Sequence, residues 1–202
     1  MSKWGCENMS MHATHKILAA AAGVEKVRPG EIVNVKIDVA GINDIYLMVA
    51  HSFREMGGTK VWDPDKVAIF MDHNAPSPTV KGAENQKAFR DFALEHGIRN
   101  VFEINRGICH LVLQEEGLVK PGDVIIITDS HTTTHGALGA FSTGVGSTDL
   151  AVILMEGELW MRVPAGYNDF FIAGHRQALH CILQFPDVAR PGISFKYPQC
   201  FR

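Results

Sequence analysis

Two acid–imidazole pairs stand just after two short apolar runs of the chain. Asp72 and His73 follow the run VAIFM, and Asp129 and His131, with one serine between them, follow VIIIT. A carboxylate beside an imidazole orients the ring and stabilises its protonated form, which suits proton transfer or polarisation of a substrate oxygen. One such pair is as compatible with a loop or a helix cap as with a site. Its duplication after a second apolar run favours an acid–base site.

A second chemistry fits the same residues. Asp129, His131 and His135 have the spacing D-x-H-x-x-x-H, and together with His73 they could hold one metal ion. Zinc and manganese accept imidazole and carboxylate ligands of this kind. A mononuclear metal hydrolase therefore stays open as an alternative, and metal-dependent hydrolysis by the purified chain would favour it.

Both pairs need a scaffold that brings the two apolar runs together. The chain alternates extended and helical patterns. We expect strands at residues 32–39, 67–71, 100–104 and 124–127, and helices at residues 12–22, 44–55, 83–96, 108–117 and 147–160. This order predicts an α/β fold with a mostly parallel sheet and helices on both faces. In such a sheet, ligands bind outside the carboxyl ends of the strands, where both pairs would lie.

Side chains at the ends and faces of these helices sharpen the expected boundaries. Serine, threonine, asparagine and aspartate are the preferred helix caps. We expect Asn43 or Asp44 to cap the second helix and Ser147 or Thr148 to cap the last. The helix at residues 83–96 should pack through its apolar side chains, which are Phe89, Phe92, Ala93 and Leu94.

Composition narrows the class of protein. The 202 residues are 46% apolar and 20% charged, with a formal net charge of −3, as in an ordinary globular protein. This balance indicates neither a nucleic-acid nor a membrane-surface partner. The apolar runs are far shorter than the roughly 20 residues of a spanning helix. The first residues lack the apolar core of a signal peptide, so a cytoplasmic location is expected.

Three stretches carry a family resemblance. MDHN (residues 71–74), GICH (residues 107–110) and TDSHTTTHGALGAFSTGVGSTD (residues 128–149) resemble the aconitase superfamily. Within it, the chain is most similar to the large subunits of 3-isopropylmalate dehydratases, with homoaconitases and 2,3-dimethylmalate dehydratases next. The likeness covers roughly residues 10–164. It implies that residues 1–164 form an aconitase-type first domain, incomplete in itself.

The resemblance also implies an activity and a set of site residues. The family's enzymes are hydro-lyases that move a hydroxyl group between neighbouring carbons of a hydroxy dicarboxylic acid, here with 3-isopropylmalate of leucine biosynthesis as the best substrate. By motif, the catalytic residues would be Asp72, His73, His110, Asp129 and His131. Those lining the substrate pocket would be Ser130, Thr132, Thr133 and His135.

The cofactor and the partner are implied in the same way. The family uses a [4Fe-4S] cluster with one open iron as a Lewis acid. Its three cysteine ligands occur in motifs that this chain lacks, and Cys6, Cys109, Cys181 and Cys200 match none of their positions. We therefore expect no metal ligand in this chain, and a partner, the small swivelling-domain subunit, that shares the site. The substrate would be a small hydroxy dicarboxylate.

The last part of the chain departs from the family. Residues 165–202 lack clear periodicity and do not resemble the family's continuation, so we expect a divergent tail produced by truncation or a frameshift. Residues 42–56 differ as well, and His51 is expected to lie on a helix surface. A non-catalytic fragment that keeps the fold but binds no cluster is therefore the second alternative.

Overall fold

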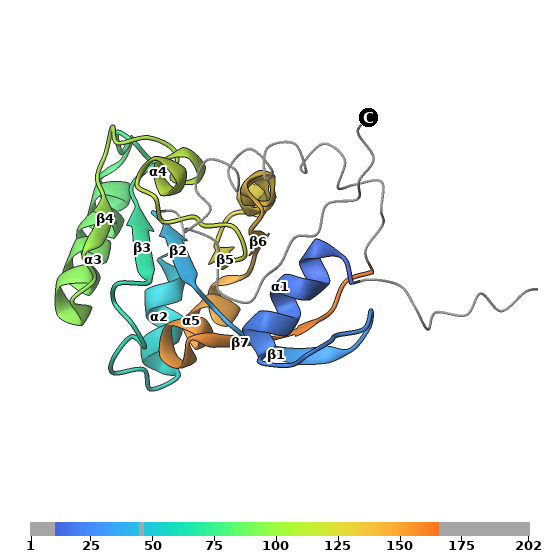
Figure 1. Cartoon of the computed structure of the whole chain (residues 1–202). Coiled ribbons are helices and arrows are strands. Elements are labelled where there is room, and N and C mark those ends of the chain that lie inside the picture. The colour runs from blue at the N-terminus through green and yellow to red at the C-terminus, as the bar shows by residue number, and fades with distance from the viewer. Residues whose placement is uncertain (1–10, 45–46, 166–202) are drawn as a thin grey trace, which may run out of the picture.

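A five-stranded parallel sheet forms the centre of the molecule (Figure 1). The computed structural model describes residues 11–44 and 47–165. Across the sheet the strands follow the order β4-β3-β2-β5-β6. Their bounds are Val39–Asn43 for β2, Val67–Phe70 for β3, Asn100–Phe102 for β4, Val124–Ile127 for β5 and Phe141–Gly144 for β6. The predicted α/β fold with a mostly parallel sheet is confirmed, although β6 was not expected.

Among residues 11–44 and 47–165, five α-helices and one 3-10 helix connect and cover these strands. They are α1 (Ala13–Ala22), α2 (Met48–Glu55), α3 (Val80–His96), α4 (Cys109–Glu115), η1 (Ser130–Leu138) and α5 (Ser147–Glu156). Left-handed glycines end α1 and α3, at Gly23 and Gly97. Glycine adopts this backbone conformation without steric cost, which is why it stops a helix so reliably. None of the helices in the described part of the chain is long and apolar enough to cross a membrane.

Alternate residues of each central strand enter two different apolar cores. Val67 and Ile69 of β3 pack with the side chains of α2, α3 and α5, including Phe53 and Phe92. Ala68 and Phe70 face the opposite side, where Val112 and Leu113 of α4 cover the sheet. A continuous apolar strand with helices on both faces is the arrangement that parallel sheets require. The helices on both faces are therefore confirmed.

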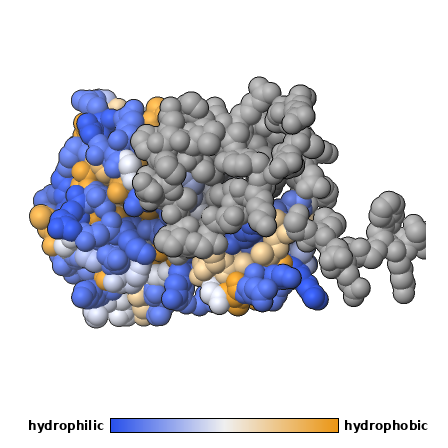
Figure 2. All heavy atoms as spheres, viewed as in Figure 1, coloured by the Kyte–Doolittle hydropathy of each residue, from blue (hydrophilic) through white to orange (hydrophobic). Residues whose placement is uncertain are grey.

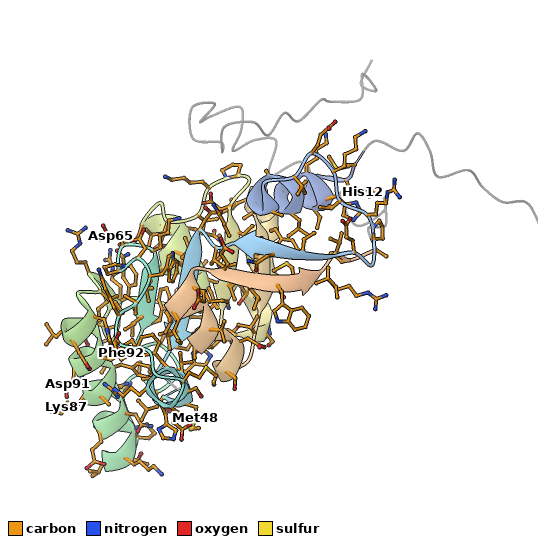
Figure 3. The ribbon with its side chains drawn as sticks, turned by 90° about the horizontal axis from the view of Figure 1, so that it is seen from below. His12, Met48, Asp65, Lys87, Asp91 and Phe92 are labelled. Atoms are coloured by element: carbon orange, nitrogen blue, oxygen red, sulfur yellow. The ribbon has the colours of Figure 1, made fainter. Side chains whose placement is uncertain are left out.

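Helix α3 shows how the sequence pattern becomes a buried face. Phe92 is fully buried and packs edge-on against Phe53 of α2, with ring centroids 5.7 Å apart. Lys87 and Asp91 form an ion pair on the outer side of the helix, as Figure 3 shows. The expected burial of Phe89, Phe92 and Ala93 is confirmed, whereas the expectation for Leu94 is wrong, since it is 82% exposed. The visible surface in Figure 2 is mostly hydrophilic, with scattered apolar residues.

A separate two-stranded ribbon lies beside the parallel sheet. It pairs β1 (Ile32–Lys36) with β7 (Glu158–Arg162) in antiparallel register. The predicted single strand at residues 32–39 is wrong, because the chain leaves β1 after Lys36 and enters the main sheet as β2. The helix predicted to reach residue 160 stops at Glu156. The reason is Gly157, which has a φ of 72° and lies so close to Trp62 that a Cβ would sit 2.3 Å from its Cδ1.

Three of the predicted helix boundaries are wrong. Asn43 and Asp44 cap no helix, since Asn43 ends β2 and α2 begins only at Met48. The residue that precedes α5 is Gly146, which makes no side-chain cap bond. Helix α3 starts at Val80, where the Thr79 hydroxyl accepts a hydrogen bond from the Gly82 N–H. The side chains of Asn43 and Asp44 instead form hydrogen bonds with the segment that follows β3.

The order of the strands contains a point at which the winding of the sheet changes direction. From β2 the chain proceeds outward through β3 to β4, and then returns to the other side of β2 with β5 and β6. The winding direction therefore reverses between β2 and β5. In open α/β sheets this switch point, at the carboxyl ends of the strands, is where ligands bind. Residues 166–202, and with them almost all of the predicted tail, lie outside the described residues.

Candidate active site

Three strand ends bring the predicted acid–imidazole pairs together. The pairs follow β3 and β5, which are not neighbours in the sheet, because β2 lies between them. His73 Nε2 nevertheless lies 3.5 Å from Asp129 Oδ2, and His131 Nδ1 lies 3.4 Å from Asp129 Oδ1. Both imidazoles therefore approach a single carboxylate. This convergence meets the geometric requirement for one shared acid–base site.

Asp129 is the carboxylate that these rings share. His110, in the first turn of α4, donates from Nε2 to Asp129 Oδ1 at 2.8 Å, closer than the ring of His131. The backbone N–H of His131 also donates to Oδ1, at 2.7 Å, so that Asp129 caps η1 as well. Burial raises the pKa of Asp129, but these hydrogen bonds and the positive charge of the rings outweigh it and hold the pKa below its usual value.

Glycine at one position lets β6 pass beside this carboxylate. Gly144 ends β6, and a Cβ there would lie 2.3 Å from the backbone oxygen of Asp129. No side chain fits at that distance, so the close approach of the two segments requires glycine. The glycine-rich pattern after the second acid–imidazole pair thus supports the position of Asp129 itself.

Asp72 is the most enclosed acid of the predicted set, with a side chain only 2% exposed. It accepts hydrogen bonds from the backbone N–H of Cys109 at 2.8 Å and from His73 Nδ1, also at 2.8 Å. Burial raises the pKa of Asp72, yet these bonds and one from Asn43 leave the pKa below its usual value. Asp72 therefore stays ionised and holds one edge of the His73 ring.

His73 lies between two carboxylates, those of Asp72 and Asp129. Burial lowers the pKa of His73, but the hydrogen bond to Asp72 and the charges of Asp72, Asp129 and Asp44 raise it more, so the net shift is upward. A protonated ring has N–H donors on both nitrogens, which fits Asp72 at Nδ1 and Asp129 at Nε2. Its side chain is 31% exposed, so a ligand can reach it.

Asn43 belongs to the site although the sequence indicated only a helix cap. It is fully buried at the end of β2, between the two pairs. Its Nδ2 donates to Asp72 Oδ1 at 3.2 Å and to Cys109 Sγ at 3.2 Å, and its Oδ1 accepts from Thr128 Oγ1 at 3.0 Å. Asn43 therefore ties the ends of β3 and β5 together. Only the position of β2 in the sheet, which local sequence does not reveal, could have identified it.

The residues predicted to line the substrate pocket fall into two groups. Ser130 and Thr133 are exposed, so a ligand can contact them. Thr132 and His135 are fully buried on the inner side of η1, and the Thr132 hydroxyl donates to the backbone oxygen of Asp129. The 3-10 helix η1 turns these two side chains toward the protein interior, and their contact with a substrate stays a prediction.

His135 instead lies behind His110. The two ring centroids are 5.6 Å apart in an edge-to-face arrangement. Burial, together with the positive charge of His110, lowers the pKa of His135 to about 4, so its ring is neutral at physiological pH. A neutral ring in this place fills space beside His110 without competing with it for a proton.

The described residues do not fit the ligands of an iron–sulfur cluster. Such clusters are held by cysteine thiolates. Cys109 is fully buried, and burial together with the charge of Asp72 raises the pKa of its thiol to about 12. It is therefore a protonated core residue. Cys6, Cys181 and Cys200 lie outside the described residues.

The metal-hydrolase ligand set does not assemble either. Buried His135 cannot join Asp129 and His131 in one coordination sphere, and in the described ranges the side chains with ligand atoms within 4.8 Å of one another are Asp44, Asp72 and His73. Both oxygens of Asp44 already accept hydrogen bonds from N–H groups. These bonds occupy the lone pairs that a metal would need, so we do not interpret the group as a metal centre.

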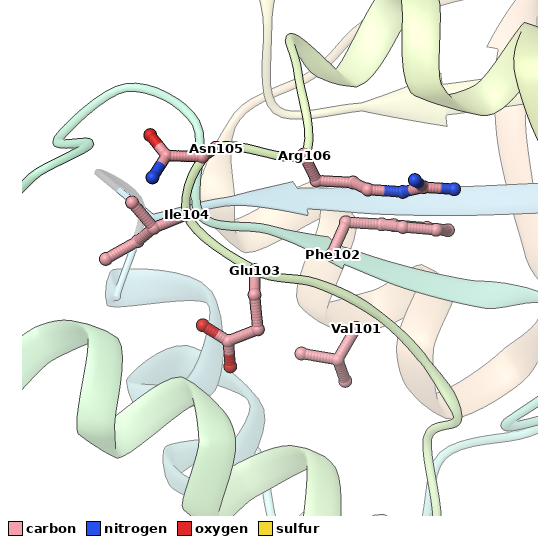
Figure 4. A pocket seen from close by; sticks show the side chains of 6 residues that line it. All are labelled: Val101, Phe102, Glu103, Ile104, Asn105 and Arg106. Atoms are coloured by element: carbon pink, nitrogen blue, oxygen red, sulfur yellow. The ribbon is translucent and has the colours of Figure 1, made fainter.

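A hollow of about 310 Å³ lies elsewhere, along the end of the edge strand β4 (Figure 4). Residues 101–106 line it, and none of the predicted site residues is among them. Its charges are satisfied by ion pairs, with Glu103 bound by Arg90 at 2.6 Å and Arg106 paired with Glu116. The hollow therefore offers no free acid or base for chemistry.

Comparison with known proteins gives a consistent result. The model of the aconitase family (aconitate hydratase) matches residues 15–171. A probable 3-isopropylmalate dehydratase large subunit of Methanothermobacter thermautotrophicus is 50% identical over 157 residues, and the 3-isopropylmalate dehydratase large subunit of Moorella thermoacetica is 52% identical over 158 residues. A probable methanogen homoaconitase large subunit of Methanothermobacter thermautotrophicus is 45% identical over 161 residues.

The extent of these matches is the same for the three relatives. Each match covers 77% of this chain and 38% of the relative. The chain thus spans well under half the length of the proteins it resembles. The match to the large subunits confirms the resemblance stated from the three sequence stretches.

Proposed function

Because the chain belongs to the aconitase family, we propose that it supplies the acid–imidazole half of a hydro-lyase active site. The observation that carries the proposal is the approach of three imidazoles, those of His73, His110 and His131, to the Asp129 carboxylate within 3.5 Å. The names of the relatives favour 3-isopropylmalate as the substrate, within leucine biosynthesis. The proposal keeps the cytoplasmic location expected from the sequence.

The described side chains account for one part of such a reaction. Dehydration breaks a C–O bond and a C–H bond on the neighbouring carbon, whose electron pair forms the new C=C bond. A base outside the described side chains would take the carbon-bound proton, and the departing hydroxide must gain another. His73, with its raised pKa and its Nε2 3.5 Å from Asp129 Oδ2, is the group that we assign as the donor of the proton to the hydroxide. Asp72 keeps the His73 ring in orientation through the bond at Nδ1. His110 would stabilise the negative charge that develops on the departing oxygen, and Asp129 would hold the His110 ring through the bond at Nε2.

The substrate carboxylates need hydrogen-bond donors. The exposed hydroxyls of Ser130 and Thr133 lie next to the acid–imidazole cluster along the chain. Such groups bind carboxylates in many proteins. No cluster ligand fits among residues 11–44 and 47–165, so a [4Fe-4S] group would be held by cysteines other than Cys109. The relatives are named large subunits, which favours a small subunit as the partner of this chain.

Ligand binding by the chain tests this proposal directly. Adding 3-isopropylmalate should shift the ring NMR signals of His73 and His131, whereas the ring of His96, buried between Phe53 and Phe92, should not respond. A folded chain in which no site imidazole responds to the diacid would overturn the proposal. Malate, which lacks the isopropyl group, is the matched ligand that tests the substrate assignment.

A second measurement separates the chain from its cofactor. Iron–sulfur reconstitution of the purified chain should leave no visible absorbance, because Cys109 is a buried thiol and Cys6, Cys181 and Cys200 match none of the family's ligand motifs. In the assembled enzyme, His110→Gln should lower the rate of dehydration by about 10²–10⁴-fold, the usual contribution of acid–base groups. The matched control is His96→Gln, which changes a buried histidine far from the cluster. A stable cluster in the chain alone would contradict the cofactor assignment.

A further inference from the structure

A buried carboxylate outside the predicted site holds the turn that carries His73. Asp44 follows Asn43 at the end of β2 and is fully buried. Its Oδ1 accepts a hydrogen bond from the backbone N–H of His73 at 3.0 Å, and its Oδ2 accepts one from the N–H of Asn74 at 3.0 Å. Hydrogen bonds to an ionised acceptor are about twice as strong as neutral ones. Asp44 therefore fixes the backbone on which the His73 ring stands.

Gln86 completes this arrangement from the inner face of α3. The residue is 2% exposed and lies one turn before the buried Phe89. Its Nε2 donates to Asp44 Oδ2 at 2.9 Å and to the backbone oxygen of Asn74, also at 2.9 Å. A buried amide costs free energy unless its hydrogen bonds are made, and here one donor bond goes to the Asp44 carboxylate and the other to the backbone of the turn. The amide thus connects α3 to the turn after β3.

We infer that Asp44 and Gln86 are positioning residues that hold the turn at residues 73–74, and with it the His73 ring, between Asp72 and Asp129. Two donors from the turn meet Asp44, and one acceptor of the turn meets Gln86. The turn is therefore held through both its N–H groups and a carbonyl. The inference rests on the proposed function only in taking His73 as the group that acts.

The charge of Asp44 has a second consequence for the same ring. Three carboxylates face His73 from three strand ends, Asp72 after β3, Asp129 after β5 and Asp44 after β2, and each raises the pKa of the imidazole. Asn43, which also lies against the ring, is neutral. Asp44 acts without touching the imidazole, through the backbone and through its field. Asp44 therefore fixes the position of the His73 ring and raises the pKa of its imidazole.

Amide hydrogen exchange tests the positioning role without any substrate. The variant Gln86→Met keeps the shape of the side chain and removes both donor bonds. It should speed exchange at the N–H groups of His73 and Asn74 by about tenfold or more, since hydrogen bonds to charged groups are among the strongest in proteins. The matched control is Phe89→Leu, which weakens the same helix without touching the turn. Equal acceleration in both variants, corrected for global stability, would overturn the inference.

A second variant tests the electrostatic part. Asp44→Asn keeps the size of the side chain and removes its charge, so the pKa of His73 measured by ring NMR should fall. The exposed variant Asp91→Asn, whose carboxylate pairs with Lys87 on the far side of α3, should leave that pKa unchanged. An unchanged His73 titration in folded Asp44→Asn would contradict the assignment. Neither experiment uses 3-isopropylmalate, so a failure of the proposed function would leave both results intact.

Discussion

The ends of β3 and β5 both carry an acid followed by a histidine, but the two acids bond to imidazoles in different ways. After β3, the acid and the imidazole that are adjacent in the chain are also the bonded pair, with His73 Nδ1 2.8 Å from Asp72 Oδ1. After β5, the nearest imidazole to Asp129 is His110, from another element, at 2.8 Å. The side chain of His131, two residues along the chain, is 81% exposed.

This difference shows what sequence adjacency does and does not mean. The chain bends at His73, where the side chains of Asp72 and His73 meet. The 3-10 helix that begins at Ser130 instead brings the backbone N–H of His131 closer to Asp129 than the His131 ring. The predicted partner of Asp129 is therefore replaced by a residue from α4. Four measurements test how the two strand ends differ and whether they share one site.

The largest effect is expected at the β3 end. Asp72→Ala leaves the N–H of Cys109 and the amide of Asn43 without their acceptor in a buried place. Removing one partner of a buried charged group costs about 4 kcal/mol of unfolding free energy. Chemical denaturation measures it. Asp65→Ala, which breaks an exposed ion pair with Arg99, should cost less than about 1 kcal/mol. Similar losses in both variants would contradict the buried role of Asp72.

The second-largest effect is expected in the pH dependence of protein stability, and it comes from His135 in η1. The pKa of His135 is lowered to about 4 in the folded protein, so the unfolded chain binds more protons between that value and its ordinary pKa. The contribution of His135 to the free energy of unfolding is therefore fully present above the pKa of the unfolded state, and it is lost as the pH falls toward about 4. Between about pH 7 and pH 4 the wild type should lose about 3 kcal/mol more than His135→Leu. Parallel stability curves for the two proteins would show that the imidazole is not buried.

The third-largest effect is expected at Asp129, whose carboxylate the two strand ends share. Asp129→Asn replaces the charged acceptor of His110 and of the His131 N–H by a neutral one, which should cost about 2 kcal/mol. The pKa of His73 should also fall in this variant, because one of the three carboxylates that raise it is gone. Denaturation and ring NMR give the two values. If the titration of His73 stays as in the wild type, the two strand ends do not share a site.

The smallest effect concerns two neighbouring threonines. Thr132→Val removes a buried hydroxyl that donates to the backbone oxygen of Asp129, at a cost of about 1 kcal/mol. Thr133→Val changes an exposed residue and should stay within about 0.5 kcal/mol of the wild type. The difference between the two variants, measured by denaturation, reports which side of η1 faces the interior. Equal costs would contradict the orientation of η1.

Local patterns were sufficient for most elements of the fold. The apolar runs of β3 and β5 and the glycine ends of α1 and α3 identify these elements, because strand burial and helix termination depend on a few neighbouring residues. The ribbon of β1 and β7 could not be predicted in this way. It joins segments more than a hundred residues apart, and its partner strand was expected to continue a helix.

The same distinction between local sequence and long-range packing applies to the site. Sequence alone determined that acids and imidazoles follow β3 and β5, and its motifs determined the family, since both are properties of residues close together in the chain. Only the tertiary structure decided that β2 stands between those strands, because strand order is set by long-range packing. It thereby turned Asn43 and Asp44 from expected helix caps into supports of the site. It also made His110 the nearest partner of Asp129 and placed His135 in the interior, because the path of η1 decides which side chains meet.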